Sequence, residues 1–235
     1  MSPSDVPPTG QPTTALALAS VNPQGKALGL RPGDTLLRVD AYAVDGQTKD
    51  LLALFKHQPD RPRVLWLRRG AEVWAVLSCT AILGRWRAVS VPDAAGALPA
   101  PLPAAQLRNF EVICNADNIY DAQSQKPSVL GLLPPIYMLQ MRLWTPLAIW
   151  AALSVLCVPL GVIAGGALQA LICIYFWRAA PMLVRADRMA RGFRLWRVVA
   201  ARSERDLHRQ MVGLAPDLRF FFAAERAVLA GVEAR

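Results

Sequence analysis

Residues 144–177 lie in the longest uncharged run of the chain and give thirty-four consecutive positions without a formal charge. The preceding residues 129–143 add one charged side chain, that of Arg142. The hydrocarbon core of a bilayer is about 30 Å thick and is crossed by roughly 20 apolar residues in a helix. Soluble domains seldom contain so long a run without charge, so this feature predicts a membrane protein.

A single helix is too long for this run, because thirty-four residues would extend about 51 Å. Two helices of about 17 residues each fall at the short end of the range that spans a bilayer. Pro159 can end the first helix. Three glycines lie near the middle, where a tight reversal needs residues that tolerate positive φ: Gly161, Gly165 and Gly166. We therefore predict a helical hairpin, with helices near 143–160 and 163–180.

Residues 129–141 are also apolar, but they are too short to span a bilayer and contain the pair Pro134-Pro135. A segment of this kind can be an interfacial or re-entrant helix. It can equally be a connector that lies on the hairpin. The sequence leaves both alternatives open.

Arginine dominates the charge of the chain. The formal net charge is +9 over 235 residues, and the densest arginines follow the uncharged run directly. Basic chains bind nucleic acids or anionic membrane surfaces. Because these arginines adjoin a predicted span and no nucleic-acid-binding motif accompanies them, we expect anionic lipid headgroups as a partner and no nucleic acid.

The first ninety residues have the pattern of a small domain rich in β-strands. Short apolar runs alternate with turn residues, and Arg69-Gly70 predicts a hairpin turn. The predicted elements are strands at 14–21, 35–40, 62–68 and 72–79 and a helix at 48–57.

One run within this region resembles a known motif. Ala27-Leu-Gly-Leu-Arg-Pro-Gly-Asp34, followed by Thr-Leu-Leu-Arg-Val-Asp40, is similar to the A-x-G-L-x-x-G-D-x-I-x-x-V-[ND]-G core of bacterial PDZ domains. The later helix and strands follow the PDZ order, and the resemblance covers about residues 13–83. It implies an α+β fold, a PDZ-like small β-barrel or sandwich.

The resemblance also implies a binding site. A PDZ-like sheet has an exposed edge beside a helix, where an extended peptide adds itself as a strand. The groove would use Leu16 and Leu18 from the first strand and Thr48 and Leu52 from the helix. The alternative is that these leucines belong to the core.

Proline and alanine are enriched at residues 91–106, which predicts a semi-rigid linker. Beyond it, about 108–202, the chain weakly resembles an uncharacterised bacterial membrane family with an apolar segment ending in R-x-W, here Arg142-Leu-Trp144, and a helical hairpin. The predicted organisation is a disordered arm at 1–12, a PDZ-like domain at 13–90, the linker, a membrane domain at 107–180 and cytoplasmic basic and amphipathic helices at 181–235.

In the last segment, residues 181–201 interleave arginines with apolar and aromatic side chains, which predicts an interfacial helix. Residues 217–232 predict a final amphipathic helix. The positive-inside rule places this basic flank in the cytoplasm, and the first thirty residues show no signal peptide. We expect a bacterial inner-membrane protein with its N- and C-terminal parts in the cytoplasm. The residues expected at the headgroups are Arg178, Arg185, Arg188, Arg191, Arg194 and Trp196.

No motif predicts catalysis. The two histidines, His57 and His208, lie far apart, and the uncharged run contains no acid and no histidine. We expect no cofactor and no metal, and we interpret the cysteines as reduced apolar side chains: Cys79, Cys114, Cys157 and Cys173.

The leading hypothesis is a non-enzymatic, membrane-anchored scaffold or adaptor whose cytoplasmic PDZ-like module binds a partner peptide or strand. One alternative is an accessory structural or assembly subunit of a larger inner-membrane complex, in which small residues of the hairpin pack against other spans. A further alternative is a regulatory partner of a membrane protease or a secretion machine.

Overall fold

The computed structural model describes residues 13–44, 46–56, 58, 60–91, 100, 102–124 and 129–223. The predicted arm at 1–12, His57, most of the predicted linker and the end of the last predicted helix therefore lie outside the described residues. By its contacts the chain divides into two units, Met1–Val112 with Leu195–Arg219 and Ile113–Arg194 with Phe220–Arg235. The first unit thus continues through 91–106, where the sequence predicts a boundary.

The first sheet has six strands in the order β5-β4-β2-β1-β6, with β3 paired to β2. They are β1 (Thr13–Val21), β2 (Thr35–Val39), β3 (Tyr42–Ala43), β4 (Arg63–Arg69), β5 (Glu72–Ser78) and β6 (Gly84–Val91). The predicted closed barrel is wrong, because β5 and β6 end the sheet on opposite sides and the sheet stays open. The sequence analysis also missed β6, whose mostly exposed side chains give no clear strand pattern.

Burial explains why these strands form. β1 is buried on both faces from Ala15 to Leu18, and β4 is buried from Val64 to Leu67. Burying one leucine or valine side chain contributes about 1.5–3 kcal/mol. Two helices accompany the sheet, and the second buries Leu51 on its inner side: α1 (Pro23–Ala27) and α2 (Thr48–Lys56).

Two elements from the end of the chain belong to the first unit, β9 (Arg194–Ala201) and α6 (Glu204–Leu214). The predicted helix at 181–201 is therefore wrong from residue 191 onward, where α5 has ended. Within β9, the Arg197 guanidinium pairs with the carboxylate of Glu72 and lies 4.3 Å from the ring centroid of Trp74. Burial lowers the pKa of the Arg197 side chain, and the hydrogen bond to Glu72 opposes that effect.

A glycine makes the approach of β9 possible. A Cβ added to Gly29 would lie 2.5 Å from the Cα of Arg197, and Gly29 has a φ of +70°. Both features require glycine at this position. The N–H of Val198 then donates to the carbonyl of Leu28 at 3.2 Å.

A second sheet has the strand order β10-β8-β7-β9. Its other strands are β7 (Arg108–Cys114), β8 (Ile119–Ser124) and β10 (Arg219–Phe220). Before β7, the short 3-10 helix η1 (Ala104–Gln106) follows Leu102, which packs with Ala104 against the apolar cluster of Val64, Trp66, Ala75, Leu107 and Ala200. The described end of the predicted linker is therefore part of a core.

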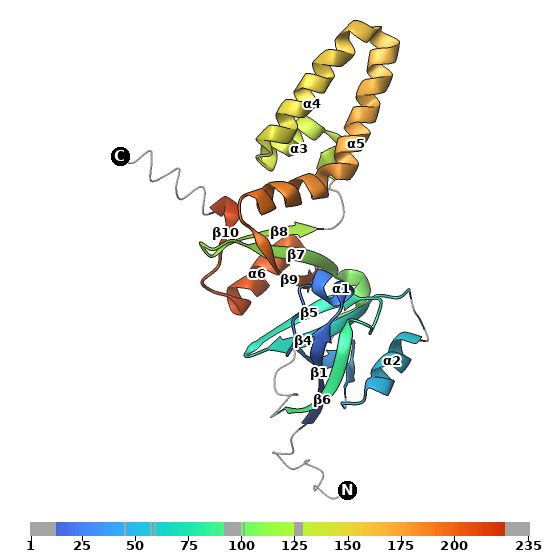
Figure 1. The fold of residues 1–235 in the computed structure, drawn as a ribbon, viewed down its shortest axis with the longest axis vertical. Helices are drawn as coiled ribbons and strands as arrows, with labels where there is room; N and C mark the ends of the chain where they lie inside the picture. Colours follow the sequence, from blue (N-terminus) through green and yellow to red (C-terminus); the bar gives the residue numbers. More distant parts are fainter. Residues whose placement is uncertain are drawn as a thin grey trace, which may run out of the picture. The chain divides into compact units, whose positions relative to one another are not determined.

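The second unit contains the uncharged run. Its helices are η2 (Val129–Leu132), α3 (Pro134–Gln140), α4 (Trp144–Cys157), η3 (Val158–Leu160) and α5 (Gly161–Ala190). α4 and α5 run side by side as a hairpin that reverses at η3 (Figure 1). α5 extends ten residues beyond the predicted end at 180. A β-sheet region followed by a long apolar helical region is thus confirmed.

The stretch Trp144–Ala190 is the one part of the described chain that is long and apolar enough to cross a membrane, by length and composition. Only 6% of its most apolar window is buried inside the structure. The core helix of a soluble protein would be mostly buried.

The hairpin is held by close packing and one polar contact. Gln169 Nε2 donates to Ser154 Oγ across the two helices at 3.0 Å. A Cβ at Gly165 would lie 2.4 Å from the Cys157 carbonyl oxygen, whereas a Cβ at Gly166 would meet nothing within 4 Å. At Gly165, therefore, α5 packs directly against the backbone at the end of α4.

This pair of glycines provides a matched test. We expect Gly165→Ala to destabilise the detergent-solubilised protein by about 1–3 kcal/mol, because the methyl group collides with a backbone carbonyl. Gly166→Ala should be neutral or stabilise by up to about 1 kcal/mol, because alanine favours a helix. Thermal unfolding followed by circular dichroism measures both, and equal effects of the two substitutions would contradict the packing described.

α5 ends in a buried ion-pair cluster. The Arg188 side chain is fully buried, and its Nε donates to Asp121 of β8 at 2.7 Å. A second carboxylate, that of Asp187, accepts from Arg188 Nη1 at 2.7 Å, and the guanidinium lies 4.1 Å from the ring centroid of Phe221. Desolvating a guanidinium costs several kcal/mol, which two carboxylates and an aromatic face offset here.

Removing one partner should therefore be costly. We expect Arg188→Met to destabilise the protein by about 3–5 kcal/mol, since it leaves the Asp121 carboxylate buried without its cation. Arg178→Met, on the exposed surface of the same helix, should change stability by less than about 0.5 kcal/mol. Denaturant unfolding in detergent measures the free energy of unfolding of both variants. Similar losses would show that the buried ion pair contributes no more to stability than an exposed arginine.

Candidate functional site

The first sheet ends at β6, which pairs with β1 and with no other described strand. α2 contacts β6, and Figure 1 places the helix beside this end of the sheet. A strand edge next to a helix is the geometry in which an extended peptide adds as a further strand. We call β6 together with α2 the β6–α2 edge.

The predicted groove residues lie near this edge, but β1 does not provide it. Because β1 lies between β2 and β6, Leu16 and Leu18 are fully buried core residues. This corrects the prediction that the first strand is the open one. On α2, Thr48 is half-buried and Leu52 is 44% exposed.

One face of the sheet nevertheless brings the predicted residues together. Leu16 and Leu18 have Ala88 and Trp86 as their Cα partners on β6, and paired residues of antiparallel strands project from the same face. The chain that enters α2 crosses this face, because a Cβ at Gly46 would lie 3.6 Å from the Cβ of Ala88. Leu16 and Leu18 thus lie in the core, on the face of the sheet that α2 adjoins.

The start of β6 is anchored by hydrogen bonds to the loop before α1. Asn22 Nδ2 donates to the carbonyl of Ile82 at 2.7 Å, and the Asn22 N–H donates to the carbonyl of Leu83 at 3.1 Å. Trp86 Nε1 donates to the carbonyl of Ala81 at 2.9 Å. These bonds hold the strand against β1 and leave its outer side toward α2 and solvent.

The opposite edge of the sheet is covered at one residue. Asn109 pairs with the backbone of β5 at Leu77: its Oδ1 accepts from the N–H of Leu77 at 2.9 Å, and its Nδ2 donates to the Leu77 carbonyl at 2.9 Å. Edge strands left uncovered invite pairing with other chains. Among the described residues, β5 thus has a side-chain partner at its edge, whereas β6 pairs with β1 alone.

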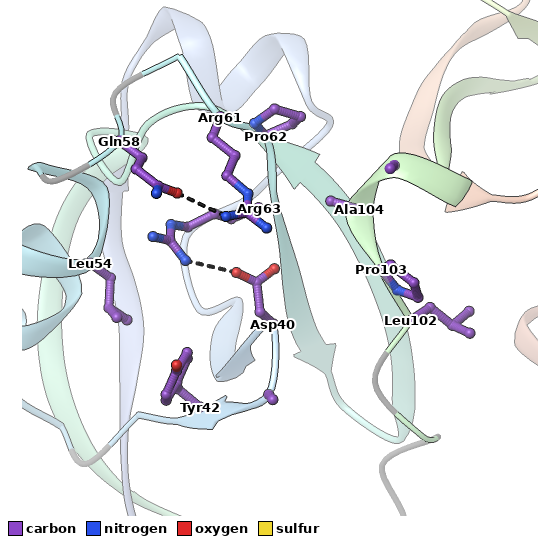
Figure 2. A pocket seen from close by; sticks show the side chains of 12 residues that line it. Asp40, Tyr42, Leu54, Gln58, Arg61, Pro62, Arg63, Leu102, Pro103 and Ala104 are labelled. Carbon is purple, nitrogen blue, oxygen red and sulfur yellow. Dashed lines mark hydrogen bonds and ion pairs between the residues drawn. The ribbon is translucent and has the colours of Figure 1, made fainter.

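A hollow of about 740 Å³ lies at the far end of α2. Figure 2 shows Tyr42 and Leu54 on one side of it, Leu102, Pro103 and Ala104 on the other, and Arg61 and Arg63 between them. It is an open hollow with both apolar and basic walls.

Its one carboxylate is fully engaged. Asp40 has a φ of +52°, and its Oδ2 accepts from Arg63 Nη1 while its Oδ1 accepts from the N–H of Val64, both at 2.8 Å. Arg63 also lies 5.7 Å from the ring centroid of Phe55. Asp40 thus fixes the turn between β2 and β3 to β4, and it is not a free general base.

A second hollow, of about 540 Å³, also lies within the first unit. It is mainly apolar, and the indole nitrogens of Trp66 and Trp74 have no hydrogen-bond partner among the described residues. Its lining also includes Val73, Leu102, Leu107, Ala200, Gln210 and Leu214. Its chemistry suits an apolar side chain.

The residues predicted at lipid headgroups divide into two groups. Arg178, Arg185 and Arg194 are exposed, and Arg191 is exposed with its Nε 3.0 Å from Asp187. Arg188 is fully buried in the cluster with Asp121, so its predicted role at headgroups is wrong. Trp196 lies half-buried in β9, with the guanidinium of Arg197 3.8 Å from its ring centroid.

Across the described ranges, no three His, Cys, Asp or Glu side chains gather in a way that could hold a metal ion. The four cysteines are free thiols, with Cys157 buried and Cys79 exposed.

No protein-family model matches this chain, and the comparisons with curated proteins and with solved structures found no match either. The PDZ resemblance accordingly rests on the residue pattern quoted above.

The cover at the edge of β5 can be tested directly. Asn109→Ala removes both bonds to Leu77, so we expect a loss of about 1–3 kcal/mol of stability and faster amide exchange at Leu77. Asn109→Asp keeps the acceptor for the Leu77 N–H and should preserve more of that amide's protection. Hydrogen exchange by mass spectrometry measures the difference. Unchanged protection in the alanine variant would mean that another group covers Leu77.

Proposed function

We propose that this chain is a non-enzymatic, membrane-anchored adaptor whose first unit binds an extended segment of a partner protein at the β6–α2 edge. The observation that carries the proposal is the difference between the two sheet edges. Asn109 satisfies the N–H and the carbonyl of Leu77 in β5, whereas β6 pairs, among the described strands, with β1 alone and contacts α2. A peptide strand would gain backbone hydrogen bonds from β6 and apolar contact from α2.

The geometry of the glycine-aspartate pair supports the PDZ resemblance. Gly33 has a φ of +94°, and the buried Asp34 accepts from the N–H of Arg31 and pairs with Arg69 at 2.7 Å. These contacts close the turn that leads into β2. The pair therefore has a structural role, which leaves peptide binding to the sheet edge.

The charges near the edge favour an acidic partner segment. Arg85 and Arg87 on β6 and Lys49 and Lys56 on α2 are exposed, against one exposed acid on α2, Asp50. Exposed charges of one sign attract and orient a partner of the opposite sign. Leu52 and Ile82, 44% and 62% exposed, supply apolar surface in the same region.

The second unit would supply the anchor. The hairpin exposes apolar side chains on its outer faces, and Arg178 directly follows its uncharged part. By the positive-inside rule, this end faces the cytoplasm of a bacterial inner membrane, together with the first unit. Exposed arginines such as Arg178 and Arg185 would then contact anionic headgroups.

Peptide binding is testable on the full chain in nanodiscs. We expect acidic extended peptides, selected from a random library, to bind and to slow amide exchange in residues 84–91, because strand addition places new hydrogen bonds on β6. Leu52→Asp should weaken binding at least about tenfold, as it removes an apolar contact and places a carboxylate that repels an acidic peptide.

The matched control is Val212→Asp, at an exposed apolar position on α6, which should leave binding unchanged. Binding that survives Leu52→Asp, or protection that develops at residues 60–63 beside the hollow of Figure 2, would place the site elsewhere.

A second candidate function is that of an accessory subunit of a larger inner-membrane complex. The outer faces of the hairpin carry exposed small residues, which allow close helix packing in a membrane: Ala151, Ala152, Gly161, Ala164 and Gly166. Purification from native membranes in mild detergent separates the two. Stoichiometric membrane partners would favour the subunit, and recovery without them would favour the adaptor.

A further inference from the structure

The tip of the hairpin is apolar on every side. Between Cys157 and Gln169 the sequence contains no polar or charged side chain. The tip residues are also the most exposed apolar residues of the structure, with Val162 at 92% and Ile163 at 90%. A loop that emerges from a membrane meets water and headgroups, where such a surface is unfavourable.

The two arms of the hairpin are short for a complete crossing. α4 has 14 residues, which corresponds to about 21 Å. The uncharged part of α5, residues 161–177, corresponds to about 25 Å. A hydrocarbon core is about 30 Å thick, and a spanning helix needs roughly 17–25 residues. α4 alone falls below that range, and α4 with η3 or the uncharged part of α5, at 17 residues each, only meets its lower limit.

The base of the hairpin is built to stay at the surface. α3 packs across both arms, because Tyr137 and Met138 share one apolar cluster with Leu143 and Phe176. The segment from the end of η2 through α3 also exposes apolar side chains: Leu132, Leu133, Ile136 and Leu139. Trp144, 62% exposed, begins α4. Exposed tryptophans at the end of an apolar helix are typical of the membrane interface.

The turn makes helical hydrogen bonds of its own, as backbone in hydrocarbon needs internal partners. The N–H of Val158 donates to the carbonyl of Val155, and the N–H of Gly161 donates to the carbonyl of Val158. Gly161, at a φ of +76°, completes the reversal.

From these four features we propose that the hairpin enters the bilayer from one side and reverses within the hydrocarbon. α3 lies along the interface and limits the depth of insertion, and the tip around Val162 stays in the acyl chains. The proposal rests on the membrane anchorage proposed above. It replaces two complete crossings with a re-entrant hairpin, so one face of the membrane meets no part of the hairpin.

Single-cysteine labelling tests this topology. In a full-length background with the four native cysteines replaced, Val162→Cys reports on the tip and Val212→Cys on α6. A membrane-impermeant maleimide is applied to sealed right-side-out vesicles, to inverted vesicles and to detergent-solubilised membranes. We expect Val212→Cys to react from one side only. Val162→Cys should react at least tenfold more slowly from both sides and normally in detergent, because a thiol in hydrocarbon does not ionise.

Every outcome is informative. Labelling of Val162→Cys from the side opposite Val212→Cys means a complete crossing and overturns the re-entrant topology, while membrane anchorage stands. Labelling from the same side, or release of the protein by alkaline carbonate, overturns the anchorage itself. Ile163→Cys serves as a second tip position if Val162→Cys fails to fold. When a fluorophore is attached to the tip cysteine, its quenching by spin-labelled lipids should be strongest for lipids that carry the spin label in the middle of the acyl chain.

Discussion

The buried ion pair between Arg188 and Asp121 holds the base of the second unit together. It joins the end of α5 to β8, and it is covered by the ring of Phe221. A guanidinium taken out of water needs fixed partners, so this contact fixes the last turn of α5 against β8. The neighbouring Arg191, bonded to Asp187 and to the Arg142 carbonyl, ties the same end of α5 to the segment that precedes α4.

In the first unit, the two edge strands of the sheet, β5 and β6, have different hydrogen-bond partners. A single asparagine pairs with the backbone of Leu77 at the edge of β5, and the return of β9 is secured by Arg197 between Glu72 and two tryptophan rings. β6 has no comparable cover among the described strands. An uncovered sheet edge can pair with other chains, which promotes aggregation of a monomer but lets a binding module take up a peptide strand. The proposed function centres on this edge for that reason.

Parts of this architecture could be predicted, and particular residues show where prediction fails. The glycines near 161 and the charge-free run led to a helical reversal, which the structure contains at η3. The arginines after 180 resembled an interfacial helix, but Arg188 is buried and the chain continues as β9. Periodicity records side-chain type, and it does not record that a carboxylate in β8 or a tryptophan in β5 lies opposite an arginine.

The sequence by itself determined that the second unit contains a long apolar stretch, because thirty-four consecutive positions carry no charge, and the structure leaves all but 6% of the most apolar window of that stretch unburied. It also determined the turn at Gly33-Asp34, where φ above zero selects glycine. Only the tertiary structure decided which strand forms the sheet edge next to α2. The side chains of β6 do not alternate regularly between buried and exposed, so the strand is recognised by its pairing with β1. It likewise decided which arginine is buried, because that depends on partners distant in the chain.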